Sequence, residues 1–240
     1  MNNPDEKKKF VKEKFSSISK DYDFLNTILS FHIDRYWRWL TTRMLRDYPE
    51  GTILDLCAGT LPLALELTRQ APERQVLAVD FCEDMLLAGI NNLPDDERKN
   101  RIIPICGDGE KIPVANESCW GITVAFGVRN LSRTQDGIKE MYRVLKTGGK
   151  LLILEFSRPT NPIISPFYNL YLNRILPIIA GMVSGDKEAY DYLASSIAKF
   201  YEPEELMGMM KIAGFNKVYR KPLTFGIVSI YIGEKCTPRA

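Results

Sequence analysis

The stretch that decides the fold begins Thr52-Ile53-Leu54-Asp55-Leu56-Cys57-Ala58-Gly59-Thr60 and ends Val76-Leu77-Ala78-Val79-Asp80. A short apolar strand runs into a tight turn at Gly59, and a second apolar strand, one helix later, ends in a lone carboxylate. In an open α/β sheet such a turn brings backbone N–H groups close to a ligand, and the acid that ends the next strand accepts hydrogen bonds from two ribose hydroxyls. The pattern therefore predicts a nucleotide site. A purely structural turn with an unrelated Asp80 is the alternative.

The glycines around this turn limit which nucleotide it can hold. A dinucleotide site needs the spacing G-x-G-x-x-G, but here only Gly59 is present and Thr60-Leu61-Pro62 follows it. Two further strand ends, Gly107-Asp108-Gly109 and Ala125-Phe126-Gly127, add small residues at the same edge of the predicted sheet. A nucleoside without phosphates, such as the adenosine part of S-adenosylmethionine (SAM), therefore suits this site better than NAD.

The composition is ordinary for a globular protein, with 240 residues, 45% of them hydrophobic and 26% charged. We expect a single domain over residues 1–240. The net charge of +2 gives no indication of nucleic-acid binding. Five scattered cysteines without C-x-x-C spacing predict reduced thiols and no metal site. Because the sequence shows neither a signal-peptide core nor an apolar run of membrane-spanning length, we expect a cytoplasmic protein.

Strands and helices alternate through most of the sequence. Apolar runs predict strands at residues 52–56, 75–80, 101–106, 119–125 and 149–156, and helical periodicity predicts helices at 61–70, 82–91 and 133–145. The segment 145–150 reads as a helix stop and turn. A helix at 202–213, ended by Gly214, and two last strands at 216–221 and 226–233 follow. This order predicts an α/β fold with a mostly parallel seven-stranded sheet and helices on both faces.

Two segments lie outside this alternation. Residues 1–48 predict an N-terminal helical segment, with Lys7-Lys8-Lys9 on a solvated face. Residues 159–200 contain four prolines and are rich in Tyr, Leu and Ile. Connections of this length are usually lids or insertions, so we expect a helical cover over the cofactor. Ordinary core helices are the alternative.

Several further short sequence elements are distributed along the chain. They are the stretch from Phe15 to Asn26 (FSSISKDYDFLN), Ser30, Trp37-Arg38, Phe126-Gly127-Val128-Arg129-Asn130, the stretch from Met141 to Gly149 (MYRVLKTGG), Leu154-Glu155-Phe156-Ser157, Tyr190, Tyr192-Leu193 and Ala213-Gly214-Phe215. In these elements the chain resembles, from Phe15 to Gly233, the C-methyltransferases of menaquinone and ubiquinone biosynthesis. The element F-G-x-R-N after the fourth strand is specific to this family among SAM enzymes. The resemblance implies the Rossmann-like fold of class I SAM-dependent methyltransferases.

The resemblance also implies a reaction and a set of cofactor contacts. The reaction is transfer of a methyl group from SAM to a ring carbon of a reduced polyprenyl quinone, either demethylmenaquinol or a ubiquinone precursor. The family's cofactor contacts fall on Thr60, Asp80, Asp108, Gly109 and Ala125, and the strand and turn described above add Asp55 and Gly59. The chain departs from the family's usual pattern at Leu61-Pro62 (usually Gly-Asp), at Ala125 (often Ser) and at His32 (commonly Gly).

Methyl transfer to a ring carbon sets the requirements for a catalytic residue. The reacting atoms must be aligned, and the neighbouring ring oxygen must be deprotonated or nearly so. A general base or a cation that stabilises the phenolate is therefore needed. Arg129 follows the fourth strand, where open α/β sheets bind ligands, and its guanidinium stays charged near neutral pH. We expect Arg129 to be catalytic, stabilising the oxyanion or orienting a water. A surface ion pair is the alternative.

Four residues are expected to contact the substrate: Tyr22, Asn26, His32 and Asn130. His32 is the only histidine, and histidine is the usual base near neutral pH, although a packed or partly exposed side chain is the alternative. Tyr22 alternatively packs between N-terminal helices, and Asn26 alternatively caps a turn. No Ser-His-Asp arrangement and no clustered metal ligands compete for the chemistry, and the identity of the general base stays open.

Two other functions fit the same sequence. One is a SAM methyltransferase for another apolar small molecule, and the other is a non-catalytic SAM-binding subunit of a quinone-synthesis complex. Because a polyprenyl quinol lives in the bilayer, we expect a prenyl channel along residues 159–200 and loose peripheral contact with the inner face of the membrane, helped by Lys7, Lys8 and Lys9. A homodimer is compatible with the sequence, which does not decide the oligomeric state or the choice between the menaquinone and ubiquinone pathways.

Overall fold

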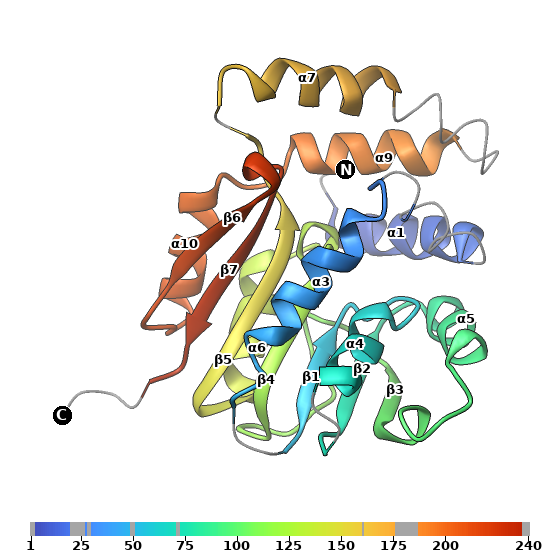
Figure 1. Cartoon of the computed structure of the whole chain (residues 1–240), viewed down its shortest axis with the longest axis vertical. Coiled ribbons are helices and arrows are strands. Elements are labelled where there is room, and N and C mark those ends of the chain that lie inside the picture. The colour runs from blue at the N-terminus through green and yellow to red at the C-terminus, as the bar shows by residue number, and fades with distance from the viewer. Residues whose placement is uncertain are drawn as a thin grey trace.

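A twisted sheet runs through the centre of the molecule (Figure 1). The computed structural model describes residues 3–19, 27, 30–48, 51–70, 73–159, 161–175 and 187–236, except for the side chains of residues 173, 175 and 187–191. Within these ranges seven strands form one sheet in the order β3-β2-β1-β4-β5-β7-β6. Strands β1 to β5 run parallel, whereas β7 is antiparallel to both β5 and β6. The predicted mostly parallel seven-stranded sheet is therefore confirmed.

The strands lie close to their predicted positions, with two differences. They are β1 (Ile53–Leu56), β2 (Val76–Asp80), β3 (Ile102–Cys106), β4 (Cys119–Ala125), β5 (Leu145–Phe156), β6 (Tyr219–Leu223) and β7 (Val228–Glu234). The turn predicted at 145–150 is instead part of β5, because the pairing with β4 shifts register there and Gly148 adopts a φ of 87°. The strand predicted at 216–221 starts later, because Phe215 is buried in the core beside the last helix.

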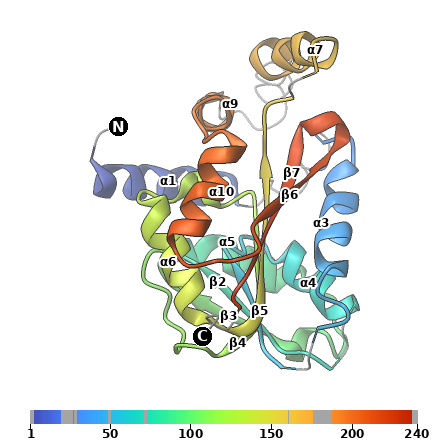
Figure 2. The same ribbon diagram turned by 90° about the vertical axis from the view of Figure 1, so that its left-hand side faces the viewer.

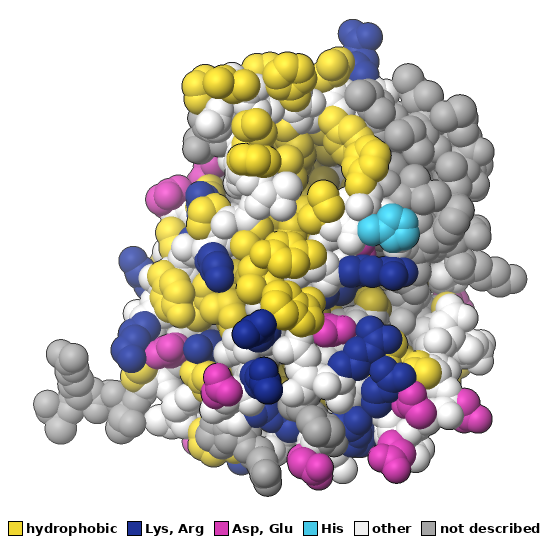
Figure 3. All heavy atoms as spheres, viewed as in Figure 1, with side chains coloured by type: hydrophobic (Ala, Val, Ile, Leu, Met, Phe, Trp, Pro, Cys, Tyr) yellow, Lys and Arg dark blue, Asp and Glu magenta, His cyan; other side chains and the backbone are white. Residues whose placement is uncertain are grey.

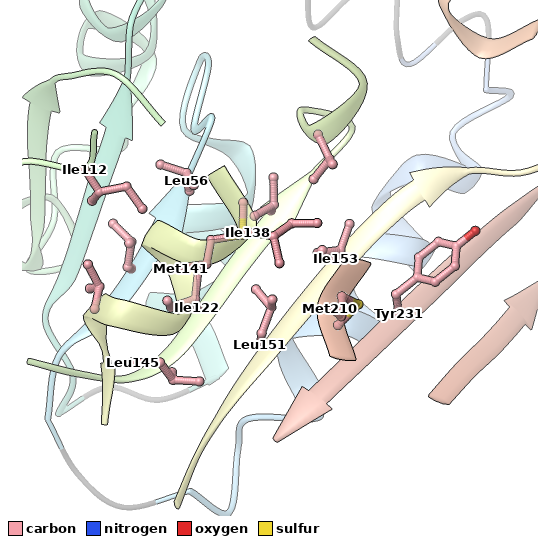
Figure 4. Packing of buried hydrophobic residues seen from close by; sticks show 14 of the residues in the cluster. Leu56, Ile112, Ile122, Ile138, Met141, Leu145, Leu151, Ile153, Met210 and Tyr231 are labelled. Carbon is pink, nitrogen blue, oxygen red and sulfur yellow. The ribbon is translucent and has the colours of Figure 1, made fainter. Parts of the chain in front are cut away.

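Helices cover both faces of the sheet (Figure 2). They are α3 (Ile33–Arg43), α4 (Pro62–Gln70) and α5 (Glu83–Asn92) over one face, and α6 (Thr134–Val144) and α10 (Pro203–Ile212) over the other. Figure 4 shows Ile138 and Met141 of α6 and Met210 of α10 packed toward β4 and β5. Burial on both faces explains why the central strands read as nearly continuous apolar runs.

The segments outside the alternation gather over one end of the sheet. In Figure 1, α1 (Pro4–Ile18), α7 (Ile164–Leu170) and α9 (Lys187–Ala198) lie above the carboxyl ends of the parallel strands. A π-helical turn (Tyr171–Ile175) continues α7. Within the described ranges no helix combines the length and apolarity required to span a bilayer. The segments that interrupt the βα alternation are thus placed where an open α/β sheet binds its ligands.

Candidate active site

Two cavities open at the carboxyl ends of the parallel strands. β1 and β4 are neighbours, but the helices that follow them, α4 and α6, pack on opposite faces of the sheet. Ligands bind in the crevice left by such a reversal. The strand-end cavity, of about 300 Å³, is lined mainly by residues at the strand ends, which include Asp80, Asp108, Gly109, Gly127 and Asn130. The apolar cavity, of about 360 Å³, is lined mainly by aromatic and aliphatic side chains that include Phe126, Phe156, Tyr168, Leu172 and Ile197.

Asp80 lies at the end of β2 and holds the first turn in place. Its carboxylate accepts a hydrogen bond of 2.8 Å from the Gly59 N–H and one of 2.9 Å from the Cys82 N–H. Burial raises the pKa of Asp80, against the effect of these backbone donors. Gly59 has a φ of 54°, which favours glycine. Asp80 thus lines the strand-end cavity with a carboxylate held in a fixed orientation, and its contact with a ribose stays a prediction.

Glycines allow the strand ends to approach one another around the strand-end cavity. A Cβ on Gly107 would lie 2.6 Å from Pro113 Cγ, and one on Gly127 would lie 2.3 Å from Cys57 Cβ. Both distances are far shorter than any real contact, so these positions require glycine. A cavity bordered by close-packed strand ends, with the buried Asp80 and no phosphate-binding glycine trio, suits the adenosine part of SAM.

Helix α1 closes the strand-end cavity through two lysines. Lys8 Nζ lies 2.7 Å from Asp108 Oδ2 and 2.9 Å from Glu110 Oε2. Lys7 Nζ donates to the backbone oxygens of Arg129 and Leu131, at 3.1 and 2.6 Å. The prediction of a solvated lysine face is therefore wrong for Lys7 and Lys8. The described part of residues 159–200 lines the apolar cavity, whereas α1 lines this one, and the predicted cover over the cofactor stays a prediction.

The segment 126–130 forms the wall between the two cavities. Gly127 and Asn130 line the strand-end cavity, whereas Phe126 and Arg129 line the apolar cavity. The 3-10 turn Val128–Asn130 produces this alternation, since successive residues of a tight helical turn point in different directions. Tyr192 of α9 donates a hydrogen bond of 3.2 Å to Asn130 Oδ1. The F-G-x-R-N element thus presents Gly127 and Asn130 to one cavity and the side chains of Phe126 and Arg129 to the other.

Arg129 is buried in this wall, with only 7% of its surface exposed. Its Nη1 lies 2.9 Å from Glu155 Oε1 and also donates to the Phe126 carbonyl oxygen. Glu155 is fully buried, so the ion pair is not the surface pair considered as the alternative. Among the described residues the Arg129 Nε has no hydrogen-bond partner, and neither does the hydroxyl of Tyr168 in the same cavity. Burial raises the pKa of Tyr168 well above its ordinary value, although the charge of Arg129 opposes this.

The remaining predicted residues divide into three groups. Asp80, Asp108, Gly109 and Asn130 line the strand-end cavity, and Gly59 borders it through its bond to Asp80. Asp55, Thr60 and Ala125 line neither cavity, and their cofactor contacts stay predictions. His32 is exposed and lines neither cavity, although Phe31 and Ile33 beside it line the apolar one. Tyr22 and Asn26 lie outside the described residues.

Asp55 is buried within the sheet instead. Its Oδ1 accepts a hydrogen bond of 3.0 Å from Thr123 Oγ1 on the neighbouring strand, and its Oδ2 has no partner among the described residues. Burial raises the pKa of Asp55 to about 7, against the effects of Thr123 and the charge of Arg38. Asp55 therefore joins β1 to β4 below the cavities.

Sequence reasoning missed several residues that the structure brings to the site. Glu155 carried a signal, because a lone acid inside the apolar strand Leu151–Phe156 needs a buried partner. Lys8 and Tyr168 carried none, since a lysine in a charged helix and a tyrosine in an apolar one are both common. Their positions depend on how α1 and α7 lie over the strand ends.

The comparisons with known sequences agree with this geometry. The model of the ubiE/COQ5 methyltransferase family matches residues 1–235. The chain belongs to this family. It is 41% identical over 224 residues to the ubiquinone/menaquinone biosynthesis C-methyltransferase UbiE of Syntrophotalea carbinolica, covering 93% of each chain. It is 37% identical to the demethylmenaquinone methyltransferase of Porphyromonas gingivalis, covering 94% of this chain and 92% of that one.

Solved structures confirm the fold of this ubiE/COQ5 family member. A putative SAM-dependent methyltransferase of Methanococcus maripaludis superposes with a TM-score of 0.64 at 16% identity, covering 95% of both chains. At this identity the similarity concerns the fold alone. Together with family membership, it confirms the predicted class I SAM-dependent methyltransferase fold and SAM as the cofactor.

Proposed function

We propose that this protein methylates a ring carbon of a reduced polyprenyl quinone, demethylmenaquinol or a ubiquinone precursor. In this reaction a carbon–carbon bond forms at the ring, the bond between methyl and sulfur breaks, and the ring hydrogen leaves as a proton. Bound SAM supplies the electrophilic methyl group. Residue by residue, Asp80 accepts the ribose hydroxyls, and Asp108 and Gly109 border the adenine.

The observation that carries the proposal is the position of Arg129 in the wall between the two cavities. The wall is thin, since Gly127 and Asn130 face one cavity while Phe126 and Arg129 face the other. A ring in the apolar cavity is therefore brought against the same five-residue segment that borders the strand-end cavity. This arrangement supports transfer between two ligands held on opposite sides of one element.

The proposed role of Arg129 is to stabilise negative charge on the ring oxygen. Its Nη1 is engaged by Glu155, which leaves the unpartnered Nε–H to donate to the substrate. The Tyr168 hydroxyl, also unpartnered, adds a second donor in the same cavity. Because the surroundings are apolar, a charge-assisted hydrogen bond to the oxygen is stronger here than in water. Glu155 acts as a positioning residue, because it holds the guanidinium without touching the substrate.

The apolar cavity suits the prenyl tail of such a substrate. Its wall combines Phe126 and Phe156 at the strand ends with Tyr168 and Leu172 of the insertion and Leu193 of α9. Each buried CH₂ contributes about 0.8 kcal/mol, so a single isoprene unit dominates binding if the tail enters the cavity. We propose that the described part of residues 159–200 forms this channel.

The test of the function is turnover with labelled SAM and prenylated 1,4-naphthohydroquinones under anaerobic conditions. We expect a product with the label on a ring carbon and a KM that falls steeply as the tail lengthens. Equal KM values for tailless and long-tailed substrates would remove the channel. Turnover of unrelated phenols but not of quinols would favour the methyltransferase of another apolar molecule. SAM binding without any turnover would favour the non-catalytic subunit.

We also propose that the protein is cytoplasmic and makes peripheral contact with a membrane. The mouth of the apolar cavity supports this contact. Three large apolar side chains from separate segments line it and are mostly exposed: Phe31, Phe167 and Phe225. Ile163 and Leu170, each next in sequence to a lining residue, are exposed as well. Figure 3 shows hydrophobic side chains gathered over α7 on this face, with Lys and Arg side chains below them. Exposed apolar patches of this kind occur at membrane or protein contacts.

Vesicle flotation tests this contact. The double variant Phe167→Ser and Phe225→Ser should lose binding to vesicles containing phosphatidylglycerol, because both side chains are at least 70% exposed at the mouth. Ile212→Ser, equally exposed but on α10, is the matched control and should bind like the wild type. Unchanged flotation of the double variant would contradict the membrane contact. A dimer that dissociates only in the double variant would assign the patch to a second copy of the chain.

A further inference from the structure

The apolar cavity contains a second buried ion pair, which the proposed function does not use. Arg38 and Asp34 of α3 both line this cavity, with 9% and 4% of their surfaces exposed. Arg38 Nη1 contacts Asp34 Oδ2, and Ser30 Oγ donates a hydrogen bond of 2.8 Å to Asp34 Oδ1. A buried ion pair does not stabilise a fold more than apolar residues of the same volume. Its presence in this mainly apolar cavity favours a ligand that carries a polar group there.

The two arginines of the cavity are arranged alike. Among the described residues, the Nε of Arg38 has no hydrogen-bond partner, as the Nε of Arg129 has none, and a buried carboxylate holds each guanidinium. The guanidinium carbon of Arg38 lies 5.9 Å from the Phe126 ring centre, and that of Arg129 lies 5.5 Å from the Phe156 ring centre. The centres of these two rings lie 4.7 Å apart, so each guanidinium lies against one ring of the same aromatic pair.

We propose that Arg38, held by Asp34, binds the second oxygen of the substrate ring, para to the oxygen that Arg129 binds, and thereby selects rings with two para oxygens over monophenols. The inference rests on the proposed function. The role of Arg38 is separate from the methyl-transfer step, because Arg38 binds the oxygen that is remote from the reacting carbon. A ring without that oxygen leaves the buried Arg38 Nε–H unsatisfied, and sites with such donors discriminate strongly against ligands that lack the acceptor.

A structural role for the same pair has to be distinguished from this one. Arg38 also lowers the pKa of Asp55, against burial, so it could serve only to anchor α3 on the sheet. Loss of an anchor reduces the amount of folded enzyme and affects all substrates equally. Loss of an oxygen contact affects only the substrate that carries that oxygen. The ratio of kcat/KM for two substrates separates the roles, because the concentration of folded enzyme cancels.

The experiment compares a 3-prenyl-1,4-naphthohydroquinone with the matching 3-prenyl-1-naphthol, which keeps the hydroxyl beside the free ring carbon and lacks the remote one. We expect Arg38→Gln to reduce the preference for the hydroquinone by about a hundredfold relative to the wild type. Arg38→Lys should give an intermediate preference, since it keeps the charge but loses the planar group. Arg43→Gln, an exposed position on the same helix, is the matched control and should leave the ratio unchanged.

The outcomes separate the inference from the proposed function. A wild-type enzyme that methylates neither probe contradicts the proposed function itself. A wild-type enzyme that methylates the hydroquinone, together with an Arg38→Gln variant whose two kcat/KM values fall equally, overturns the role of Arg38 and leaves the proposed function standing. A ratio that collapses in Arg38→Gln but not in Arg43→Gln establishes Arg38 as a specificity residue.

Discussion

The strand-end cavity and the apolar cavity are built in different ways. The first is lined largely by residues that follow β1, β2, β3 and β4 directly, so its shape depends on backbone at the ends of buried strands. The second collects side chains from α3, the segment 126–129, α7, α9 and the connection between β6 and β7. A site made from strand ends is fixed by the sheet. A site made from side chains of scattered segments can change without disturbing the sheet.

The largest expected effect is on turnover and comes from replacing Arg129, whose side chain lines the apolar cavity and not the strand-end cavity. Arg129→Ala should lower kcat about a hundredfold or more, because it removes a donor to an oxygen that becomes charged in the transition state. Arg129→Lys should keep partial activity. SAM affinity, measured by calorimetry, should stay near the wild-type value in both variants, since the Arg129 side chain lines only the apolar cavity. Normal turnover by Arg129→Ala would end the proposed role.

A change in the wall backbone should disturb both cavities instead of one. Gly127→Ala places a Cβ 2.3 Å from Cys57 Cβ, so the ends of β1 and β4 must separate. We expect a loss of about 1–3 kcal/mol in stability together with weaker SAM binding and slower turnover. Gly208→Ala on α10, where no atom lies within 4 Å of the added Cβ, is the control and should stabilise the protein by up to about 1 kcal/mol. Wild-type melting and SAM affinity in Gly127→Ala would show that the wall is not tightly packed.

Asp80 should matter to the strand-end cavity alone. Asp80→Ala should weaken SAM binding about tenfold or more, because two hydrogen bonds to a charged acceptor are lost. Activity at saturating SAM should fall much less than in Arg129→Ala. Unchanged SAM affinity would remove Asp80 from the site.

The pH dependence of SAM binding follows from the raised pKa of Asp80. The ionised carboxylate is the form that accepts the hydroxyls, so affinity should fall as pH decreases through the pKa of Asp80. Because burial raises this pKa, the fall should begin above the pH at which an ordinary aspartate is protonated. Asp80→Asn should bind weakly and remove this dependence, and a titration of both forms by calorimetry checks it.

The smallest expected effect concerns the closure of the strand-end cavity by α1. Lys8→Met removes a partly exposed ion pair to Asp108 and Glu110, so we expect a loss of only about 0.5 kcal/mol, seen as faster hydrogen exchange in α1. Lys9→Met is the control, because the Lys9 side chain is 80% exposed and lies 4.0 Å from Glu13. Equal exchange in the two variants would show that α1 is held by other contacts.

The sequence predicts the strand-end cavity better than the apolar cavity, because the first is built from strand ends and the second from scattered segments. The strand-end cavity follows the chain locally: an apolar run, a small-residue turn and an acid predict Asp80, Asp108 and Gly109 without knowledge of any distant contact. At two predicted positions the structure shows other contacts. Asp55 follows the strand pattern but bonds to Thr123 on the next strand, and Ala125 packs against the core cluster on the face that α3 and α4 cover.

The sequence by itself determined the sheet, its connections and the edge at which ligands bind, because burial on both faces and the βα alternation leave few other solutions. It also placed Arg129 at the carboxyl end of β4. Only the tertiary structure decided that Glu155 holds Arg129, that Lys8 closes the strand-end cavity and that Arg38 and Asp34 enter the apolar one. These contacts join residues of separate elements or depend on how α1 and α3 pack over the sheet. Local pattern cannot encode them, since each depends on where the other segment lies.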